Sequence, residues 1–409
     1  MYRKIKESQT LLINTQSKEL ADQNKSIIRF GFGQSPFMPP KSVLKALQNS
    51  VHHKEYSSVQ GDFELRQHMA AFHKAHNGLH VAPEDILIAP GSKILIFNIL
   101  MAFEAADVFI PAPAWVSYAP QAKLAGHNIV KLNTSFEEKW RVRPDTIRNA
   151  ARNKKHKVSI MILNYPGNPD GLTYGEEELK EIAQVARTLN ILVIADEIYG
   201  LLNHNQEHLS FVNYYPERTI TTTGLSKWCG AGGWRFGAAF LYKNIEPEFK
   251  QALIGIGSET YSCAPTPVQM AAKVAYKNYN ETLNYLSMQT NILKQIGNYC
   301  AAHLNASGIR VHPPAGGFYL FPDFSHHKEK LRAHRITTSN ELCRHLLEDT
   351  GVALLPASAF GFDQDYPAAR LAYVDFQAPL EGVEFDLMVD CPNVIEGISK
   401  ICDWIDSLG

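Results

Sequence analysis

The sequence has no run of apolar residues long enough to cross a membrane, which takes about 20 residues. It also has almost no net charge, because 40 Lys and Arg residues balance 41 Asp and Glu residues. This balance gives no indication of a nucleic acid or an anionic membrane as partner. The first residues lack the continuous apolar segment and the cleavage site of a secretory signal. We therefore expect a soluble, cytoplasmic protein.

The six cysteines are scattered, with no CxxC pair and no metal-ligand spacing. Free thiols in this pattern are typical of a reducing compartment. Two histidine pairs, at positions 52–53 and 326–327, lie in polar surroundings without a spaced third ligand. We predict no metal site. Internal repeats and low-complexity segments are also absent from the sequence.

Short apolar runs alternate with helical patterns from about residue 85 onward. The runs predict strands over 86–89, 107–110, 126–132, 158–163, 191–195, 219–223 and 236–242. This alternation predicts an α/β fold with a mostly parallel, open sheet that helices cover on both faces.

The pattern changes beyond residue 285. There we expect a helix over 286–306, strands near 309–312, 318–321, 353–355 and 371–375, and a C-terminal helix with one apolar face. Another strand is expected over 28–32. This order predicts a smaller α+β domain. We therefore expect an N-terminal arm that partly joins the small domain (1–45), a large domain (46–285) and a small C-terminal domain (286–409).

Polar residues stand at the ends of three predicted strands. Asn164 and Asn168 follow one strand, Asp196 follows the next, and Lys227 follows a third. Ligands of parallel sheets bind outside the carboxyl ends of the strands. We therefore expect these side chains to meet in one site.

Residues 221–237 read TTTGLSKWCGAGGWRFG, with Lys227 among small residues and Arg235 eight residues later. This combination is typical of a lysine that forms a Schiff base next to an arginine that binds a phosphate. A desolvated lysine can act as a nucleophile, and an arginine binds phosphate through two N–H groups. The alternative is a surface loop with two solvated cations. A second anion site is expected at residues 90–93, where a helix begins directly after a strand.

Eight motifs, spread over the chain from about residue 28 to the C-terminus, carry a family resemblance. In order they are YSSVQG, APGSK, PAPAWVSY, NYPGNPDG, ADEIY, LSK, GGWRFG and ARLAY. The sequence resembles the class I, fold-type I aminotransferases that depend on pyridoxal phosphate (PLP), in particular bacterial aspartate aminotransferases. The resemblance implies a large PLP-binding domain and a small domain. It also implies ping-pong transfer of the amino group of an L-amino acid to a 2-oxo acid.

The resemblance implies roles for residues around the cofactor ring. Lys227 would carry the cofactor covalently, and Asp196 would pair with its pyridine nitrogen. Tyr199 and Asn168 would hydrogen-bond the ring hydroxyl, and Trp115 would stack on the ring. Of these residues, Lys227, Asp196 and Tyr199 are the implied catalytic group.

A second set of residues is implied for the cofactor's phosphate: the N–H groups of Ser92 and Lys93, the hydroxyl of Ser226, and Arg235. Tyr56 matches the tyrosine that reaches the phosphate from a neighbouring subunit, which implies a homodimer with shared active sites. Gly91 and Gly224 depart from the family pattern, because serines often stand at these positions. The set of phosphate contacts therefore stays open.

Arg370 matches the arginine that binds the substrate's α-carboxylate, and Gly33 matches the backbone that lines the same pocket. Trp115 and Asn168 are also implied to contact the substrate. Lys93 occupies a position at which one bacterial group binds the distal carboxylate, and this favours aspartate and 2-oxoglutarate as substrates. The alternative is that Lys93 is solvated or pairs with carboxylates of the protein.

Three other classes of protein deserve comparison with a transaminase. An α,β-eliminating lyase on the same fold would use the same lysine and aspartate, and its products would distinguish it. A regulator that fuses this fold to a DNA-binding domain needs a helix-turn-helix domain, for which the segment before residue 28 is too short. A pure binding module would leave the lysine, aspartate and arginine set unused.

Overall fold

A computed structural model describes residues 26–379 and 384–409, and five single positions (7, 13, 15, 19 and 22) before them. The predicted N-terminal arm therefore lies largely outside the described residues. Within the described ranges, no helix combines the length and the apolar character that crossing a bilayer requires. The same residues contain no cluster of His, Cys, Asp and Glu that could hold a metal ion.

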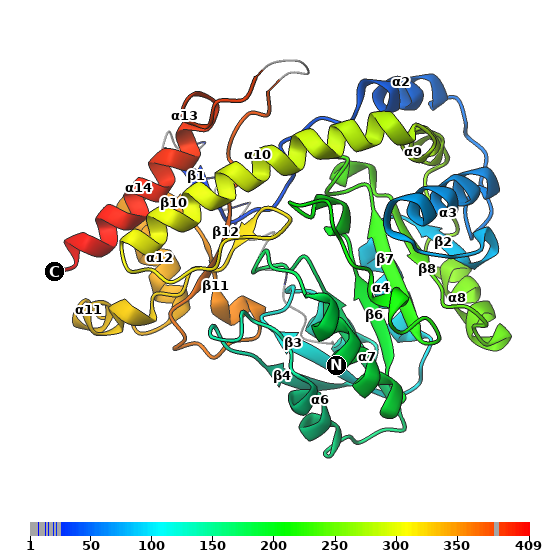
Figure 1. Cartoon of the computed structure of the whole chain (residues 1–409), viewed down its shortest axis with the longest axis horizontal. Helices are drawn as coiled ribbons and strands as arrows, with labels where there is room; N and C mark the ends of the chain where they lie inside the picture. Colours follow the sequence, from blue (N-terminus) through cyan, green and yellow to red (C-terminus); the bar gives the residue numbers. More distant parts are fainter. Residues whose placement is uncertain are drawn as a thin grey trace.

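The larger part of the molecule is built around a seven-stranded sheet (Figure 1). The strands are β2 (Ile86–Ala89), β8 (Gly237–Phe240), β7 (Thr219–Gly224), β6 (Leu192–Asp196), β5 (Val158–Asn164), β3 (Ala106–Ala112) and β4 (Asn128–Asn133), in this spatial order. All neighbours are parallel except that β8 runs antiparallel to both β2 and β7. The expectation of a mostly parallel open sheet is confirmed.

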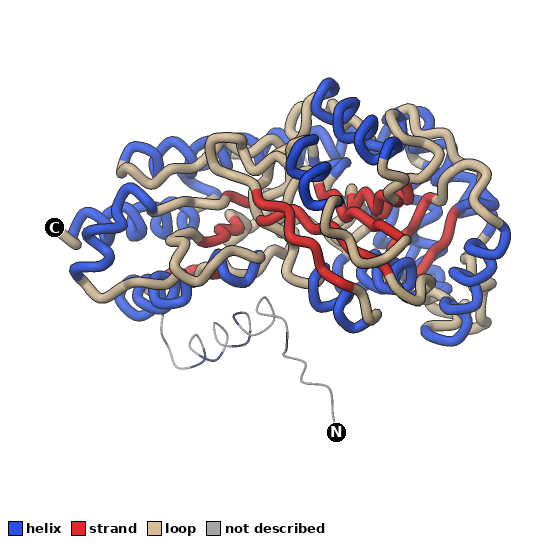
Figure 2. The backbone as a smooth tube through the Cα atoms, turned by 90° about the horizontal axis from the view of Figure 1, so that it is seen from below, coloured by secondary structure: helices blue, strands red, loops and turns tan. Residues whose placement is uncertain are grey.

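Both faces of the sheet are buried, and Figure 2 shows helices on either side of it. Along β5, Ile160 and Ile162 belong to one apolar core, while Met161 and Leu163 belong to another. The first core includes α4 (Ser92–Met101), α5 (Tyr118–Leu124) and α8 (Pro247–Thr260), and the second includes α6 (Pro144–Ala151) and α7 (Glu176–Thr188). A third core includes α2 (Lys41–Ser50), α3 (Phe63–Asn77) and α9 (Thr266–Lys277).

The 28-residue helix α10 (Tyr279–Ala306) runs from α9 to the smaller part, where it packs on α14 (Pro392–Ser407; Figure 1). That part contains an antiparallel sheet of β11 (Leu355–Pro356), β12 (Ala369–Ala372) and β9 (Tyr319–Leu320). Strand β1 (Ile28–Arg29) pairs with β10 (Val352–Ala353). The remaining helices are α11 (Lys328–Ala333), α12 (Ser339–Thr350), α13 (Leu387–Asp390) and α14 (Pro392–Ser407).

Within the described ranges, single turns of 3₁₀-helix connect these elements: η1 (Pro83–Asp85), η2 (Gly200–Leu202), η3 (Phe211–Asn213), η4 (Gly232–Trp234), η5 (Ser325–His327) and η6 (Ala357–Phe360). Most lie at the ends of strands or helices, where 3₁₀ turns are common.

The prediction of a strand over 309–312 was wrong. Only an isolated bridge joins Arg310 to Asp323. The Asn305 side chain explains the difference, because it bonds both the N–H and the C=O of Val311 (3.1 and 2.9 Å) and so takes the place of a neighbouring strand.

The long helix also begins seven residues earlier than the predicted residue 286, so the expected boundary at 285/286 lies inside α10. The missed start signal is Asn278, followed three residues later by Glu281. The Asn278 side-chain amide donates a hydrogen bond to the Glu281 carboxylate at 3.0 Å.

Candidate active site

The polar residues at the strand ends meet in one cavity. Asn164 and Asp196 are the last residues of β5 and β6, and Lys227 follows the end of β7. The cavity has a volume of about 530 Å³. Among the predicted site residues, its lining includes Gly33, Ser92, Lys93, Trp115, Asn168, Asp196, Tyr199, Ser226, Lys227, Arg235 and Arg370.

Tyr56 is the one predicted site residue that does not line this cavity. Its side chain is 88% exposed on the surface of the chain. A role for Tyr56 in a site therefore requires a second subunit that brings a cavity to it.

Asp196 is a buried carboxylate with two hydrogen-bond donors. Its Oδ2 accepts from the Tyr118 hydroxyl at 2.6 Å, and its Oδ1 accepts from the Thr222 hydroxyl at 3.0 Å. Burial raises its pKa above the ordinary value, although the two hydroxyl donors oppose this rise. The sequence interpretation missed both donors. Thr222 reaches Asp196 because the two residues are register partners on neighbouring strands.

Two asparagines link the strand end to the smaller part of the molecule. Asn164 donates from Nδ2 to the Asp196 carbonyl at 2.7 Å and accepts from the Asn168 N–H at 2.9 Å. Asn168 in turn accepts from Arg370 Nη1 at 3.1 Å. Arg370 lies on β12, so this chain of bonds fixes one part of the cavity wall relative to the other.

The Lys227 amine points into the cavity and donates to the carbonyl oxygen of Gly33 at 2.9 Å. Its Nζ also lies 5.5 Å from the ring centres of Tyr199 and Phe318. Lys227 pairs with no carboxylate in the part of the chain that the structure describes. An amine that faces a cavity and pairs with no carboxylate is placed to condense with an aldehyde there.

Two groups suited to binding an anion flank Lys227. Helix α4 begins at Ser92, and the free N–H groups of its first turn lie at the cavity. Arg235 adopts a left-handed φ of 58° and donates from Nη1 to the Gly232 carbonyl at 2.9 Å. Together they provide the arrangement expected of a phosphate site.

The glycines at positions 91 and 224 are explained by close packing. A Cβ atom on Gly91, which has a φ of 95°, would overlap the Arg235 guanidinium. A Cβ atom on Gly224 would approach the Phe236 carbonyl oxygen to 2.5 Å. Serines at these positions would displace the arginine or the neighbouring strand.

Lys93 is exposed at the open side of the cavity, and its Nζ lies 5.0 Å from the centre of the Trp115 ring. The pKa of the Lys93 amine is lowered, mainly by partial desolvation and also by the nearby charges of Arg235 and Lys227. Among the described residues, no carboxylate pairs with Lys93. The alternative of a pair with protein carboxylates is therefore not found there.

Arg370 is a buried cation without an anionic partner. It is 1% exposed and donates from Nη2 to the Gly31 carbonyl at 2.6 Å. Its Nε has no hydrogen-bond partner, and no carboxylate among the described residues pairs with it. Desolvation lowers the pKa of the guanidinium. A buried charge of this kind calls for an anionic ligand.

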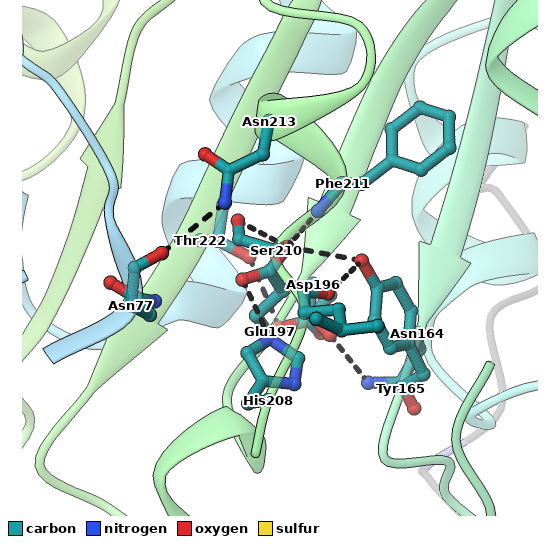
Figure 3. A network of polar contacts seen from close by, with 11 residues as sticks. Asn77, Asn164, Tyr165, Asp196, Glu197, His208, Ser210, Phe211, Asn213 and Thr222 are labelled. Carbon is teal, nitrogen blue, oxygen red and sulfur yellow. Dashed lines mark hydrogen bonds and ion pairs between the residues drawn. The ribbon is translucent and has the colours of Figure 1, made fainter. Parts of the chain in front are cut away.

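Directly after Asp196 comes a second buried carboxylate, Glu197, which does not line the cavity and holds a polar network of its own (Figure 3). It accepts hydrogen bonds from His208 Nε2 (2.9 Å), the Ser210 hydroxyl (2.9 Å) and the Phe211 N–H (3.0 Å). This network ties the segment after β6 to the end of the strand and thereby holds the backbone of Asp196.

Comparisons with known proteins place the chain in a family. The family model described as "Aminotransferase class I and II" matches residues 25–374. An aspartate aminotransferase of Bacillus sp. (strain YM-2) is 31% identical over 362 residues, which cover 87% of this chain and 89% of the relative. An asparagine–oxo-acid transaminase of Streptococcus mutans is 29% identical over 378 residues, which cover 90% and 92%.

A solved structure of the aspartate aminotransferase from Thermus thermophilus with maleate has a TM-score of 0.85 and is 25% identical, covering 98% of this chain and 100% of that chain. The chain therefore belongs to the aminotransferase class I and II family. It is an aminotransferase of the PLP-dependent class, with the fold-type I architecture that the motifs implied. The relatives named here give no support to a lyase.

Proposed function

We propose that this enzyme transfers the amino group between an L-amino acid, with aspartate favoured, and a 2-oxo acid, with PLP held in the cavity. The observation that carries this proposal is the placement of Lys227, Asp196 and Arg370 around one cavity of about 530 Å³. These three residues supply an amine, a buried carboxylate and an unpaired guanidinium. Each is a group that amino-group transfer with this cofactor needs.

The chemistry of the lining fits PLP. The phosphate would bind the first turn of α4 together with Ser226 and Arg235, and Asp196 would face the pyridine nitrogen. Trp115 supplies an aromatic face, and Tyr199 a buried hydroxyl for the ring oxygen. PLP, when bound, supplies an aldehyde for amines and a ring that delocalises the electrons of the Cα–H bond.

The residues of the chain perform the remaining steps. Arg370 would orient the substrate through its α-carboxylate, because a guanidinium fixes the plane of a carboxylate as well as its position. Lys227, whose amine is unpaired except for the Gly33 carbonyl, would take the proton from Cα and deliver it to the C4′ carbon of PLP. A second half-reaction with another 2-oxo acid would run these steps in reverse.

The preference for aspartate rests on Lys93. Its amine has no carboxylate partner among the described residues and lies over Trp115 at the open side of the cavity. It is therefore available to a distal carboxylate. Several of the relatives are named aspartate aminotransferases, which supports the same preference.

We also propose that two copies of the chain share their active sites. Tyr56 is 88% exposed, and a phenol at such a position can serve the phosphate of a neighbouring subunit. The proposed large domain (46–285) carries Lys227, and the proposed small domain (286–409) carries Arg370.

All six cysteines are free, which supports a reducing compartment such as the cytoplasm.

The decisive experiment is a screen of L-amino acids against the PLP-loaded enzyme. We expect aspartate to convert the cofactor to its aminated form, with one 2-oxo acid released for each cofactor. Release of ammonia and pyruvate would instead identify an eliminating lyase. A protein that binds no PLP would refute the proposal.

A further inference from the structure

Tyr319 lies next to Tyr199, Arg370 and Gly33, and no role has yet been given to it. It is the first residue of β9 and is 1% exposed. Its strand pairs with β12, which carries Arg370, and its side chain lines the cavity. A buried phenol in this place is positioned by both the sheet and the cavity wall.

The hydroxyl of Tyr319 lies 2.9 Å from the hydroxyl of Tyr199. A pair of phenols at this distance shares one hydrogen bond, and its direction matters for a ligand. If Tyr319 donates, Tyr199 keeps its own proton for a ligand in the cavity. If Tyr199 donates, it offers the ligand only an acceptor.

The Arg370 guanidinium lies over the face of the Tyr319 ring, with its Cζ 4.7 Å from the ring centre. A cation over an aromatic face is attracted by the ring, and this contact fixes the guanidinium plane. Among the described residues, the Tyr319 hydroxyl has no hydrogen-bond partner other than Tyr199, whereas a ligand in the cavity can accept the Tyr199 proton. Both protons are therefore used when Tyr319 donates to Tyr199.

The ring of Tyr319 also fills the space beside Gly33. A Cβ atom on Gly33 would overlap its hydroxyl and ring carbons. The carbonyl of Gly33 holds the Lys227 amine at 2.9 Å, so Tyr319 also packs against the backbone that positions the lysine. A single side chain thus contacts the segments that hold the amine, the tyrosine and the arginine.

We propose that Tyr319 is a positioning residue that couples the substrate-carboxylate arginine to the tyrosine on the cofactor side. Its hydroxyl donates to Tyr199 and leaves the Tyr199 proton free for the ring oxygen of the cofactor. Its ring holds the Arg370 guanidinium in the plane that receives an α-carboxylate. This inference rests on the function proposed above.

The first test is Tyr319→Phe, which keeps the ring and removes the hydroxyl. We expect PLP to bind the apoenzyme about three- to tenfold more weakly, measured by quenching of tryptophan fluorescence, as the loss of one hydrogen bond predicts. The KM for aspartate should stay within about twofold, because the ring contact with Arg370 remains. An unchanged dissociation constant for PLP would overturn the role of the hydroxyl.

A matched control is Tyr373→Phe. Tyr373 is also a buried phenol, its hydroxyl donates to the Gly317 carbonyl at 3.4 Å, and it does not line the cavity. We expect its PLP affinity to equal that of the wild type. An equal loss of PLP affinity in both variants would mean that the effect is structural and would overturn the proposal.

Tyr319→Leu removes the ring as well. We expect the KM for aspartate and the dissociation constant of succinate, which has carboxylates but no amine, to rise about two- to thirtyfold above those of Tyr319→Phe. Equal values in the two variants would show that the ring does not position Arg370.

The double variant Tyr199→Phe/Tyr319→Phe tests the coupling itself. If Tyr319 acts through Tyr199, the double variant should bind PLP as weakly as Tyr199→Phe alone. Losses that multiply would overturn the coupling. If the wild type binds PLP and transaminates, and Tyr319→Phe has the same PLP affinity, only this inference is refuted. If the wild type binds no PLP, the proposed function is refuted.

Discussion

Arg370 donates a hydrogen bond from Nη1 to Asn168 Oδ1 over 3.1 Å, although 202 positions separate the two residues in the chain. The bond sets the angle of the guanidinium, because Nη2 is held at the same time by the Gly31 carbonyl at 2.6 Å. The Nε remains without a partner. The arginine is therefore oriented by neutral acceptors and keeps its charge for a ligand.

The variant Asn168→Asp therefore tests whether Arg370 binds the substrate's α-carboxylate. The new carboxylate would pair with Arg370 and compete with the substrate's α-carboxylate. We expect the KM of every amino acid to rise about tenfold to a hundredfold, the range of a hydrogen bond to a charged group. Asn340→Asp, at an exposed site on α12, serves as the charge control, and its kinetics should match the wild type. A rise confined to one substrate would contradict the assignment.

The covalent role of Lys227 predicts that Lys227→Ala still binds PLP but cannot be trapped with it by borohydride. Transamination should fall by at least about 10²–10⁴-fold, the contribution of a general acid–base group. Mass spectrometry of the reduced, digested protein locates the labelled lysine. Lys250→Ala is a suitable control, since this amine pairs with Asp85 at 2.7 Å outside the cavity. Label on another lysine in the wild type would refute the assignment.

The sheet and the strand-end residues could be predicted from the sequence because both follow from local patterns. Buried parallel strands are continuous apolar runs, and the polar residue at each end marks the edge of the sheet. Asn164, Asp196 and Lys227 are visible in this way, and the structure brings them to one cavity.

The contacts that tune the site could not be predicted, because they depend on register and on packing between distant segments. Thr222 reaches Asp196 only because β6 and β7 pair at those two residues. Tyr319 reaches Tyr199 only because the smaller sheet packs against the end of the larger one. Nothing in the local sequence around these residues distinguishes them from ordinary core positions.

Asp170, next to the cavity, provides a prediction for pH dependence. It is 9% exposed, and burial raises its pKa to about 6, although the Arg141 charge opposes the rise. The folded state therefore holds this proton more tightly than the unfolded state. Its contribution to stability is present below pH 3.8 and is lost as the pH rises through about 6.

Asp170→Asn removes this titration and keeps the Oδ1 that accepts from the Leu172 N–H at 2.7 Å. Its free energy of unfolding should exceed that of the wild type by up to about 3 kcal/mol above pH 6, and the gain should shrink toward pH 4. Urea denaturation at pH 4, 5, 6 and 8 measures the difference. Asp145→Asn, at an exposed site on α6, should show no such trend. A gain that is independent of pH would contradict the argument.

Substrate preference separates the two cations at the cavity. Every amino acid offers an α-carboxylate, so Arg370→Ala should lower kcat/KM for all of them. The expected loss is about 2–5 kcal/mol, the cost of leaving a buried charge unpaired.

Lys93 contacts no protein carboxylate among the described residues, so Lys93→Ala should lower kcat/KM for aspartate while sparing alanine and phenylalanine. The measurement is kcat/KM of both variants on the three substrates. An equal loss on all three in Lys93→Ala would assign Lys93 to the phosphate site and remove the case for aspartate. A loss on aspartate alone would show that this exposed amine, and not the fold, selects the dicarboxylate.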